Sequence, residues 1–552
     1  MESNRLIVAI VIMVAVLYAY QRFLQWRYPN LYGPHAHHTP AAPGPGQPSP
    51  ATSPFGKPTA PPLATTNPSA PPSATPERTV RIDTDLFEAV LSSRGARLVS
   101  FQLKKYRETA APNSPPYQVI RYSDRLPLGL VVTQDTASFS DADVAYTTDA
   151  PPTIDLRSGA AQVTFNGVAP DGTRLQKVFS FAPATYLFDL EARALPPRGA
   201  PPTALALTIV QPLTALPGYR DYPEIQAEVA NKVVTAQESA LKKGVAPLSG
   251  PISFAGFGDR YFLMALLPQQ PAAGTLAMTY ADGEGETQLS FPATTQIRTR
   301  VFVGPKALQV LEAADPQLRN ALDLGWWGII ALPFIRLLKL FYRVVPNYGV
   351  AIILLTVLVR LLTLPMSIRG QRSMMRMQRL QPQIERLREK LKDDSEKLNR
   401  EMVELYKRNH VNPLGGCLPM IVQLPVFIGL YQALLNAVDL RHAPFFGWIN
   451  DLSAPECLHI AGFPTIPWTT CAGLPVLVGL MTLSTFVQQW LMPRQPDPSQ
   501  QRMMMFMPLV FSVIFLQLPA GLTLYYLASN LLGIAQQIVL NQEFKQPVPE
   551  AK

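Results

Sequence analysis

The stretch Tyr348–Ile368, YGVAIILLTVLVRLLTLPMSI, carries a single charged residue, Arg360. About 20 mainly apolar residues in a helix cross the hydrocarbon core of a bilayer, so the stretch predicts a transmembrane helix with an arginine inside it. A charge near the centre of such a helix costs roughly 2.5–3.5 kcal/mol on insertion scales and usually faces water or a partner. The long side chain could also reach toward the headgroups. This stretch alone leaves a functional role and such snorkelling equally open.

Other apolar stretches pass the same length test. They are Leu6–Leu24, Cys417–Val438, Ala472–Pro493 and the uncharged run Met503–Gln542, which a turn signal at Leu518–Gly521 divides into two spans. Leu6–Leu24 could be a cleaved signal peptide, but no small-residue cleavage site follows it, which favours an uncleaved anchor. The sequence therefore predicts an α-helical membrane protein with six transmembrane helices.

The segment 326–345 differs from these spans. Arg336, Lys339 and Arg343 recur in it at three- and four-residue spacing. This pattern is typical of an amphipathic helix lying on the membrane surface rather than crossing it.

The orientation follows from the basic residues of the loops. Lysines and arginines outnumber acids in 369–412, which places this loop in the cytoplasm. Counting spans from there puts both termini in the cytoplasm and residues 25–347 outside. The net charge of +9 is modest for 552 residues and is not by itself a nucleic-acid signature.

The outer segment divides into two parts. Residues 29–78 are dominated by Pro, Ala, Ser and Thr, which predicts a disordered tether. From Thr79 onward short runs alternate apolar and polar residues between turn signals, as in Arg97–Leu103 and Tyr186–Glu191. This period of two predicts a large β-sandwich, and no catalytic constellation occurs in it.

The cytoplasmic loop has a helical pattern. Leu380, Ile384, Leu387 and Leu391 recur at helical spacing, and a second apolar seam begins at Leu398 after a polar turn. Two such seams predict an antiparallel helical hairpin. Its basic faces could dock on ribosomal RNA or anionic lipid, or could be solvated charge that satisfies the topology. We expect ribosome or targeting contacts in a region that contains Arg376, Arg379, Asp393, Asp394 and Lys397.

Cysteine and acid usage limits the chemistry. Cys457 and Cys471 fall in the predicted outer loop and could form a disulfide in an oxidising compartment. No metal-ligand pattern and no cofactor motif stands out. The interiors of the last four spans contain no Asp, Glu, His, Lys or Arg, which argues against a membrane enzyme. A transporter or channel would also explain Arg360, but no internal repeat supports one.

Ordered motifs give the chain a family resemblance. They include Asn347-Tyr348-Gly349 before the Arg360 span, Val411-Asn412-Pro413-Leu414-Gly415-Gly416, Trp448-Ile449-Asn450-Asp451-Leu452-Ser453, Met505-Phe506-Met507-Pro508, and Gly521-Leu522-Thr523-Leu524-Tyr525-Tyr526 with Ser529-Asn530. In this order they resemble the YidC-type membrane protein insertases of the Oxa/Alb superfamily, in the long form of Gram-negative bacteria. The likeness is strong over 326–542 and rests on arrangement elsewhere.

The resemblance implies a function without covalent chemistry. Five spans would form a hydrophilic groove, open to cytoplasm and lipid, that takes up polar segments of nascent membrane proteins while their apolar helices pass into lipid. The protein would act as insertase and chaperone in the bacterial inner membrane, alone or with the Sec translocon and its accessory subunits. The ribosome, the signal-recognition receptor and membrane lipids are further expected partners. The short, near-neutral tail after Gln542 leaves ribosome contact to the cytoplasmic loops.

The residues themselves agree with such a groove. Thr356 lies one turn before Arg360 on the same face. Gln423, Gln488 and Gln536 lie on three other spans, each in the cytoplasmic half. Interhelical hydrogen bonding would give the same pattern and averages about 0.6 kcal/mol. The resemblance further assigns Phe427, Tyr525 and Tyr526 to the path by which substrates leave, although simple packing would suit them too.

The expected organisation completes the prediction. Outside the membrane core, we expect a signal-anchor helix at 1–28, the linker at 29–78, the periplasmic β-sandwich at 79–320 and the interfacial helix at 321–346. The core transmembrane helices are expected at 347–368, 417–438, 472–493, 503–519 and 521–542. Between and after them we expect the cytoplasmic hairpin at 369–412, a periplasmic loop at 439–471, a cytoplasmic loop at 494–502 and a cytoplasmic tail at 543–552.

Overall fold

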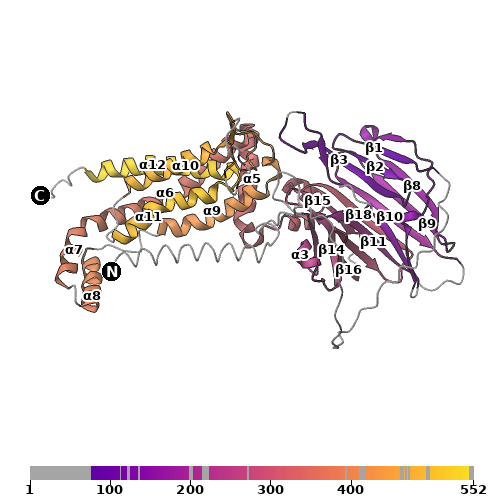
Figure 1. Cartoon of the computed structure of the whole chain (residues 1–552), viewed down its shortest axis with the longest axis horizontal. Coiled ribbons are helices and arrows are strands. Elements are labelled where there is room, and N and C mark those ends of the chain that lie inside the picture. Colours follow the sequence, from indigo (N-terminus) through magenta and orange to yellow (C-terminus); the bar gives the residue numbers. More distant parts are fainter. Residues whose placement is uncertain are drawn as a thin grey trace, which may run out of the picture.

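The computed structural model describes residues 76–545 with gaps. The gaps are 112, 121–124, 135–136, 198–202, 214–222, 270–272, 392–393, 410–417, 461–464, 467–468, 470, 472 and 493–497. The predicted anchor, residues 29–75 of the predicted linker and the tail after 545 lie outside the described residues. The described chain forms a β domain and a helical domain, which lie end to end (Figure 1).

Two packed sheets form the β domain. The smaller has the order β4 (Pro116–Gln118), β3 (Arg97–Arg107), β2 (Phe87–Ser92), β1 (Thr79–Asp83) and β7 (Thr153–Asp155). The larger has the order β6 (Ala137–Ser140), β5 (Gly129–Gln134), β11 (Thr203–Pro212), β17 (Glu284–Phe291), β16 (Ala273–Ala281), β14 (Leu248–Gly258), β15 (Phe262–Pro268), β18 (Gln296–Pro305), β10 (Leu187–Leu195), β9 (Arg174–Phe181) and β8 (Ala161–Val168). In addition, β12 (Glu224–Val229) pairs with β14, and β13 (Lys232–Ala236) pairs with β12. The architecture agrees with the predicted β-sandwich.

Aromatic side chains from both sheets fill the core between them. Phe87 stacks on Phe101 within the smaller sheet, with ring centroids 4.4 Å apart, and lies 6.4 Å from Phe181 of the larger sheet. The alternation of β9, in which every second side chain is buried, explains why Phe181 faces inward. At Gly256 strands β14 and β15 approach so closely that a Cβ would lie 2.0 Å from the carbonyl oxygen of Met264.

One inward position of β9 holds a lysine. Lys177 is fully buried, and its Nζ lies 2.6 Å from Oδ2 of Asp141 and donates to the carbonyls of Gly95 and Leu128. Arg97 contacts the other carboxylate oxygen of Asp141 at 3.1 Å. Since a buried charge is tolerated only when paired and hydrogen-bonded, this network allows the sandwich to hold charges at its centre.

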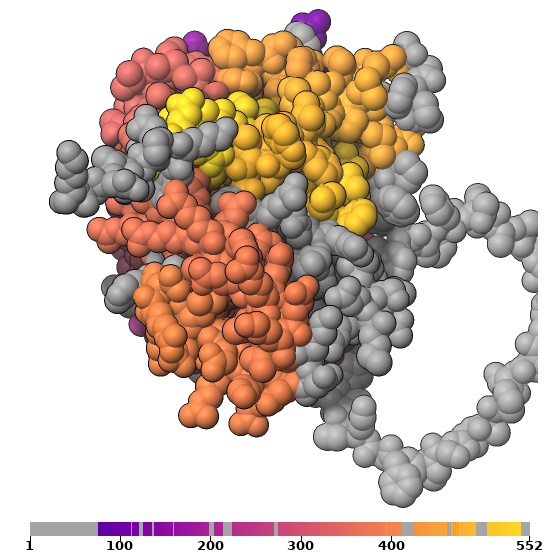
Figure 2. All heavy atoms as spheres, turned by 90° about the vertical axis from the view of Figure 1, so that its left-hand side faces the viewer, coloured from indigo at the N-terminus to yellow at the C-terminus, as the bar shows by residue number. Residues whose placement is uncertain are grey.

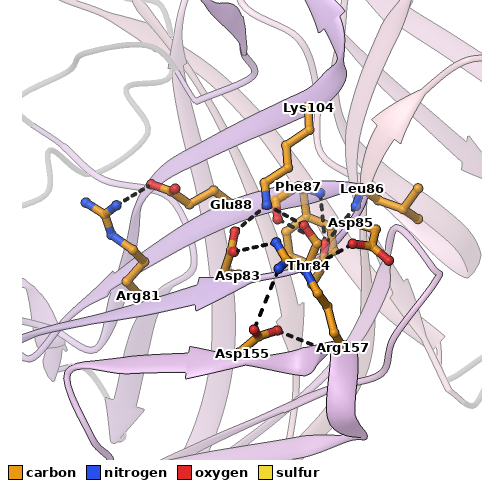
Figure 3. A network of polar contacts seen from close by, with 10 residues as sticks. All are labelled: Arg81, Asp83, Thr84, Asp85, Leu86, Phe87, Glu88, Lys104, Asp155 and Arg157. Carbon is orange, nitrogen blue, oxygen red and sulfur yellow. Dashed lines mark hydrogen bonds and ion pairs between the residues drawn. The ribbon is translucent and has the colours of Figure 1, made fainter.

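A second polar network ties the rim of the smaller sheet together (Figure 3). Asp83 pairs with Lys104 and with Arg157, and Arg157 also contacts Asp85. Thr84 Oγ1 accepts from the backbone N–H of Phe87, which closes the turn between β1 and β2. A shallow cavity of about 520 Å³ lies beside it. Because Asp83 is already paired with two cations, we assign this rim a structural role.

Three short helices connect the two domains after the last strand of the β domain: α4 (Leu308–Ala314), η3 (Pro316–Leu322) and η4 (Gly325–Trp327). A further short helix, α3 (Glu238–Leu241), lies within the β domain. Asp315 caps η3 by accepting from the N–H of Gln317, and Pro316 occupies the first helical position, where its missing N–H costs nothing.

The helical domain consists of long helices and one hairpin. Its helices are α5 (Gly328–Val344), α6 (Tyr348–Arg379), α7 (Gln381–Lys390), α8 (Ser395–Arg408), α9 (Leu418–Asn436), α10 (Val476–Leu491), α11 (Pro498–Phe515) and α12 (Ala520–Lys545). Asn347 begins α6 by accepting from the N–H of Val350, as an N-cap should. Next to it, a Cβ on Gly349 would lie 2.0 Å from the Phe445 ring, so this packing requires glycine.

Length and composition identify one clear membrane helix in the described chain. Helix α6 is long and apolar enough to cross a bilayer. Helix α10 and the apolar part of α11, Met505–Phe515, are shorter. The six-span count therefore stays a prediction.

The hairpin α7–α8 lies at the end of the helical domain that is far from the β domain (Figure 1). Leu380 and Ile384 pack against Met402, Leu405 and Tyr406, which agrees with the two apolar seams expected from the sequence. Figure 2 looks onto this end, where the orange hairpin lies below the yellow C-terminal helix.

The core of the sandwich extends into the first part of the helical domain, whose main core is a separate cluster. Ala331 and Ile335 of α5 and Ala433 of α9 belong to the same cluster of buried residues as the sandwich. Beside this core, the Arg441 guanidinium donates to the carbonyls of Arg107 and Glu108 and lies 4.8 Å from the ring centroid of Tyr117. The segment between α9 and α10 is thereby tied to the β domain.

The segment between α9 and α10 is also tied to itself and to α10. Cys457 and Cys471 are joined by a disulfide, with Cα atoms 5.5 Å apart. The buried carboxylate of Glu456 accepts from the indole N–H of Trp448 and from the N–H of Leu477, at the start of α10. Burial raises the pKa of this carboxyl.

Candidate functional site

Helix α12 contacts three helices that carry the predicted polar residues. Arg360 of α6 donates from Nε to Oγ of Ser529 at 3.0 Å, and from Nη2 to the Ser529 carbonyl oxygen at 2.7 Å. Gln423 of α9 donates to the Tyr525 hydroxyl at 2.8 Å. The Tyr525 hydroxyl also interacts with the Ser529 side chain, one turn further along α12. These contacts form a polar chain from α9 through α12 to α6.

The Arg360 guanidinium is half-buried and points at helix backbone. Hydrogen bonds to a hydroxyl and a carbonyl offset part of the cost of removing the charge from water. Among the described residues, no hydrogen bond to Nη1 is present, so one end of the guanidinium keeps its donors for another group. Tyr525 and Tyr526 are both neighbours of Arg360.

Gln488 of α10 lies against the same part of α12. A Cβ built on Gly533 would lie 2.6 Å from Gln488 Nε2 and 3.4 Å from Arg360 Nη2. The amide and the guanidinium therefore both lie against this glycine. Gln488 and Arg360 come from different helices and meet at one spot on α12.

Gln536 lies apart from this group. Its amide donates to Ser367 Oγ at 3.0 Å and to Gln371 Oε1 at 2.8 Å, two and three turns beyond Arg360 on α6. Thr356 shares the face of Arg360, but it is fully buried and its hydroxyl donates to the carbonyl of Ile352. The structure thus brings Arg360, Gln423 and Gln488 to one stretch of α12. Gln536 lies further along α12 and contacts α6 instead. The Thr356 hydroxyl hydrogen-bonds within its own helix and does not join the group.

The predicted exit-path residues form an aromatic cluster. Phe427 of α9 meets Tyr526 edge to face, with ring centroids 6.2 Å apart. Phe511 and Phe515 of α11 lie 6.4 Å and 5.2 Å from the same Tyr526 ring. Tyr525 instead points into the polar chain. The cluster joins α9 to α11 through α12.

The predicted contact region on the hairpin is partly described. Arg376, Arg379 and Lys397 are exposed. Asp394 caps α8 by accepting from the N–H of Lys397 at 3.0 Å. Asp393 lies outside the described residues. The three basic side chains are therefore accessible at the surface of the hairpin end, while Asp394 acts as the N-cap of α8.

Sequence reasoning missed several partners of the predicted residues. Ser529, Gly533, Ser367 and Gln371 were not predicted as site residues. The signal was available in the spacing of Tyr525, Ser529 and Gly533, which recur every four residues and share a face of α12. Within the described part of the chain, no group of three or more His, Cys, Asp or Glu side chains is placed to hold a metal ion.

Comparisons with known proteins cover nearly all of this architecture. A family model described as the YidC periplasmic domain matches residues 79–337, and one described as the 60Kd inner membrane protein matches 340–547. Together they define the class, an inner-membrane protein with a helical membrane domain and a periplasmic β domain.

Curated relatives narrow the class to a family. The chain is 34% identical to the membrane protein insertase YidC of Syntrophus aciditrophicus over 85% of each chain. It is 33% identical to that of Geotalea uraniireducens, over 98% of this chain and 99% of the relative. The chain belongs to the YidC family of membrane protein insertases. Members of this family are not enzymes.

A solved structure gives a weaker likeness. The crystal structure of an active YidC insertase with its first transmembrane domain resolved is 18% identical and covers 86% of this chain and 94% of its own, with a TM-score of 0.36. A TM-score this low adds nothing to the sequence matches, which already confirm the expected family and the insertase function.

Proposed function

We propose that the chain inserts nascent membrane proteins by receiving their polar segments in a hydrophilic groove around Arg360, between α6, α9, α10 and α12. The observation that carries the proposal is the convergence of Arg360, Gln423 and Gln488 on one stretch of α12. Polar groups in a membrane are costly unless they meet partners or water. A site that already collects them lowers the barrier for polar client residues in transit.

The proposed topology has six spans. They are the predicted anchor at 6–24 and helices α6, α9, α10, α11 and α12, with both chain termini in the cytoplasm. The basic hairpin α7–α8 and the β domain lie at opposite ends of the helical domain, which supports opposite sides of the membrane for them (Figure 1).

Helix α5 is proposed to lie in the outer headgroup layer. Its exposed face mixes apolar and basic side chains and contains no acid: Ile329, Pro333, Arg336, Leu340, Arg343 and Val344. Trp326, just before α5, is 95% exposed. Such a face suits acyl chains beside anionic headgroups.

The partners follow from the two ends of the molecule. The exposed arginines and Lys397 near the hairpin support contact with the ribosome, the signal-recognition receptor or anionic lipid. The aromatic cluster around Tyr526 supports an exit for client helices between α9 and α11. Work beside the Sec translocon, and a chaperone role there, are proposed on the family resemblance.

Reconstitution into liposomes tests the groove. The clients are single-span proteins with a short translocated tail that carries one Asp, or Asn at the same position. We expect Arg360→Ala to slow insertion of the Asp client by roughly 10- to 100-fold, because a hydrogen bond to a charged group is worth about 1.5–3 kcal/mol. Arg360→Lys should retain much of the activity, since it keeps the charge.

The matched control is Leu362→Ala, because Leu362 is 73% exposed two residues further along the same helix. It should insert both clients at the wild-type rate. If Arg360→Ala and Arg360→Glu insert a full panel of clients as fast as the wild type, the groove assignment is wrong.

A further inference from the structure

Ser529 is the junction of the polar chain. Its hydroxyl accepts from Arg360 Nε, and its carbonyl oxygen accepts from Arg360 Nη2. Its side chain also interacts with Tyr525, whose hydroxyl accepts from the Gln423 amide. Ser529 is itself 4% exposed, so the contacts are made inside the protein rather than at its surface. A residue in the middle of α12 thus fixes two of the three guanidinium nitrogens.

Gly533 completes this arrangement one turn later. A Cβ at this position would lie 2.6 Å from the Gln488 amide, closer than side-chain atoms normally approach. Without a side chain there, Gln488 reaches the helix surface beside Arg360. Ser529 and Gly533 together form what we name the seat of Arg360.

The seat decides which atoms of the guanidinium remain available. Nε and Nη2 are engaged, and no described residue hydrogen-bonds to Nη1. A client carboxylate would therefore meet the end of the guanidinium, where both hydrogens of Nη1 and the second hydrogen of Nη2 remain, and not the side formed by Nε and Nη2. A pre-oriented donor gains in affinity because it loses less conformational freedom on binding.

The seat also bears on the snorkelling interpretation of Arg360. An arginine that only reaches for headgroups needs no partner within the helix bundle. The two contacts with Ser529 instead hold the guanidinium against the middle of α12. Its position is set by the neighbouring helix, which is the behaviour expected of an oriented group.

We propose that Ser529, with Gly533, is a positioning residue that holds Arg360 in one orientation and thereby sets the preference of the insertase for clients with an acidic translocated tail. This inference rests on the proposed groove. Ser529 does not touch the client; it acts through Arg360. The quantity it controls is the ratio of insertion rates for the Asp and Asn clients, not the rate common to both.

The test measures that ratio for full-length variants in liposomes. Ser529→Ala should lower the ratio by roughly three- to tenfold, the value of one ordinary hydrogen bond, while the Asn client inserts as before. The effect is smaller than that of Arg360→Ala because the contact of Nη2 with the Ser529 carbonyl remains. Ser529→Thr keeps the hydroxyl and should restore the ratio. In an Arg360→Ala background, Ser529→Ala should change the ratio no further, because coupled residues are non-additive.

Thr485→Ala is the matched control. Thr485 accepts from Asn530, the neighbour of Ser529 on α12, without touching Arg360, so its loss should leave the ratio unchanged. The proposal is overturned if Ser529→Ala leaves the ratio at its wild-type value, including the case in which it slows both clients equally. It is also overturned if Ser529→Thr lowers the ratio as much as Ser529→Ala does. If Arg360→Ala itself leaves the ratio unchanged, the groove fails and the seat with it; if Arg360→Ala lowers the ratio but Ser529→Ala does not, only the seat fails.

Discussion

Lys177 shows how strongly a single residue depends on its surroundings in this protein. It occupies a core position of β9 and is paired with Asp141, which also receives Arg97 and the Tyr146 hydroxyl. Burial lowers the pKa of Lys177 to about 8, against the opposing attraction of Asp141. Sequence alternation alone predicts an apolar side chain here, because the pattern does not reveal that an acid from another segment reaches the same point.

The lowered pKa gives a pH dependence with a definite sign. Below pH 8 the lysine is charged in both the folded and the unfolded chain, so folding bears the full free-energy cost of burying the charged side chain. As the pH rises from about 8 toward the ordinary value of 10.5, the folded chain loses the proton first, and the contribution of Lys177 to stability increases.

Lys177→Met, which has no titrating group, isolates this effect. We expect the unfolding temperature of the wild type to rise relative to that of the variant as the pH increases from 7.5 to 10. Scanning fluorimetry of the full chain in detergent measures this difference. A difference between the two proteins that stays constant across this range contradicts the assignment.

Ser529 and Arg360 make the same point for the site. The charge within an apolar helix was visible in the sequence, and so were the glutamines on neighbouring spans. The partner of Arg360 was not, since its strongest contact is a backbone carbonyl and such acceptors have no signature in a sequence. Predicting the polar residues was possible; predicting which of them meet required the packing of α6 on α12.

At the scale of elements, periodicity predicted the helices better than it predicted their ends. The hairpin and the reversal before α12 lie where the spacing and the turn residues put them. Helix α6, however, runs on to Arg379, well past the expected end of the span at 368. Nothing in 369–379 stops a helix: Gly370 is tolerated inside it and its neighbours are good helix formers.

The start of α10 depends on a residue twenty positions earlier. Pro475, the residue before the helix, makes no side-chain cap, and Glu456 accepts from the N–H of Leu477 instead. Glu456→Ala should cost about 1 kcal/mol, the usual loss for a helix cap. We expect faster hydrogen exchange at Val476–Gly479 in the full chain.

Glu456→Gln serves as the companion variant, because its amide oxygen can still accept from one of the two donors. Its exchange at the start of α10 should lie between the wild type and Glu456→Ala. Equal exchange in all three proteins shows that the carboxylate does not hold the helix start.

At the scale of the whole molecule, the β domain and the helical domain are built as one piece. The sandwich core continues into α5 and α9, and Arg441 ties the segment before α10 to the backbone at the end of β3. Sequence patterns predicted both domains but not this junction, since it joins residues more than 300 positions apart through backbone oxygens. The disulfide, Glu456 and Arg441 all stabilise the end of the helical domain that faces the β domain.

The hairpin end is built differently. Its basic side chains are exposed, and a small cluster around Ile384 holds the two helices together. The contacts at the β-domain end and the exposed basic hairpin at the other end support the proposed groove, closed outside and open to the cytoplasm.

Site-specific photocrosslinking to stalled nascent chains is the sharpest test of the proposed groove. A photoreactive residue is placed at Gln423, at Gln488 or at the lipid-facing control Leu362, and the stalled client carries its polar tail at increasing distances from the ribosome. We expect the polar tail to crosslink to positions 423 and 488 at the same stage of insertion, and not to position 362. Crosslinks to position 362 with none to 423 and 488 would show that the tail does not pass through a groove around Arg360.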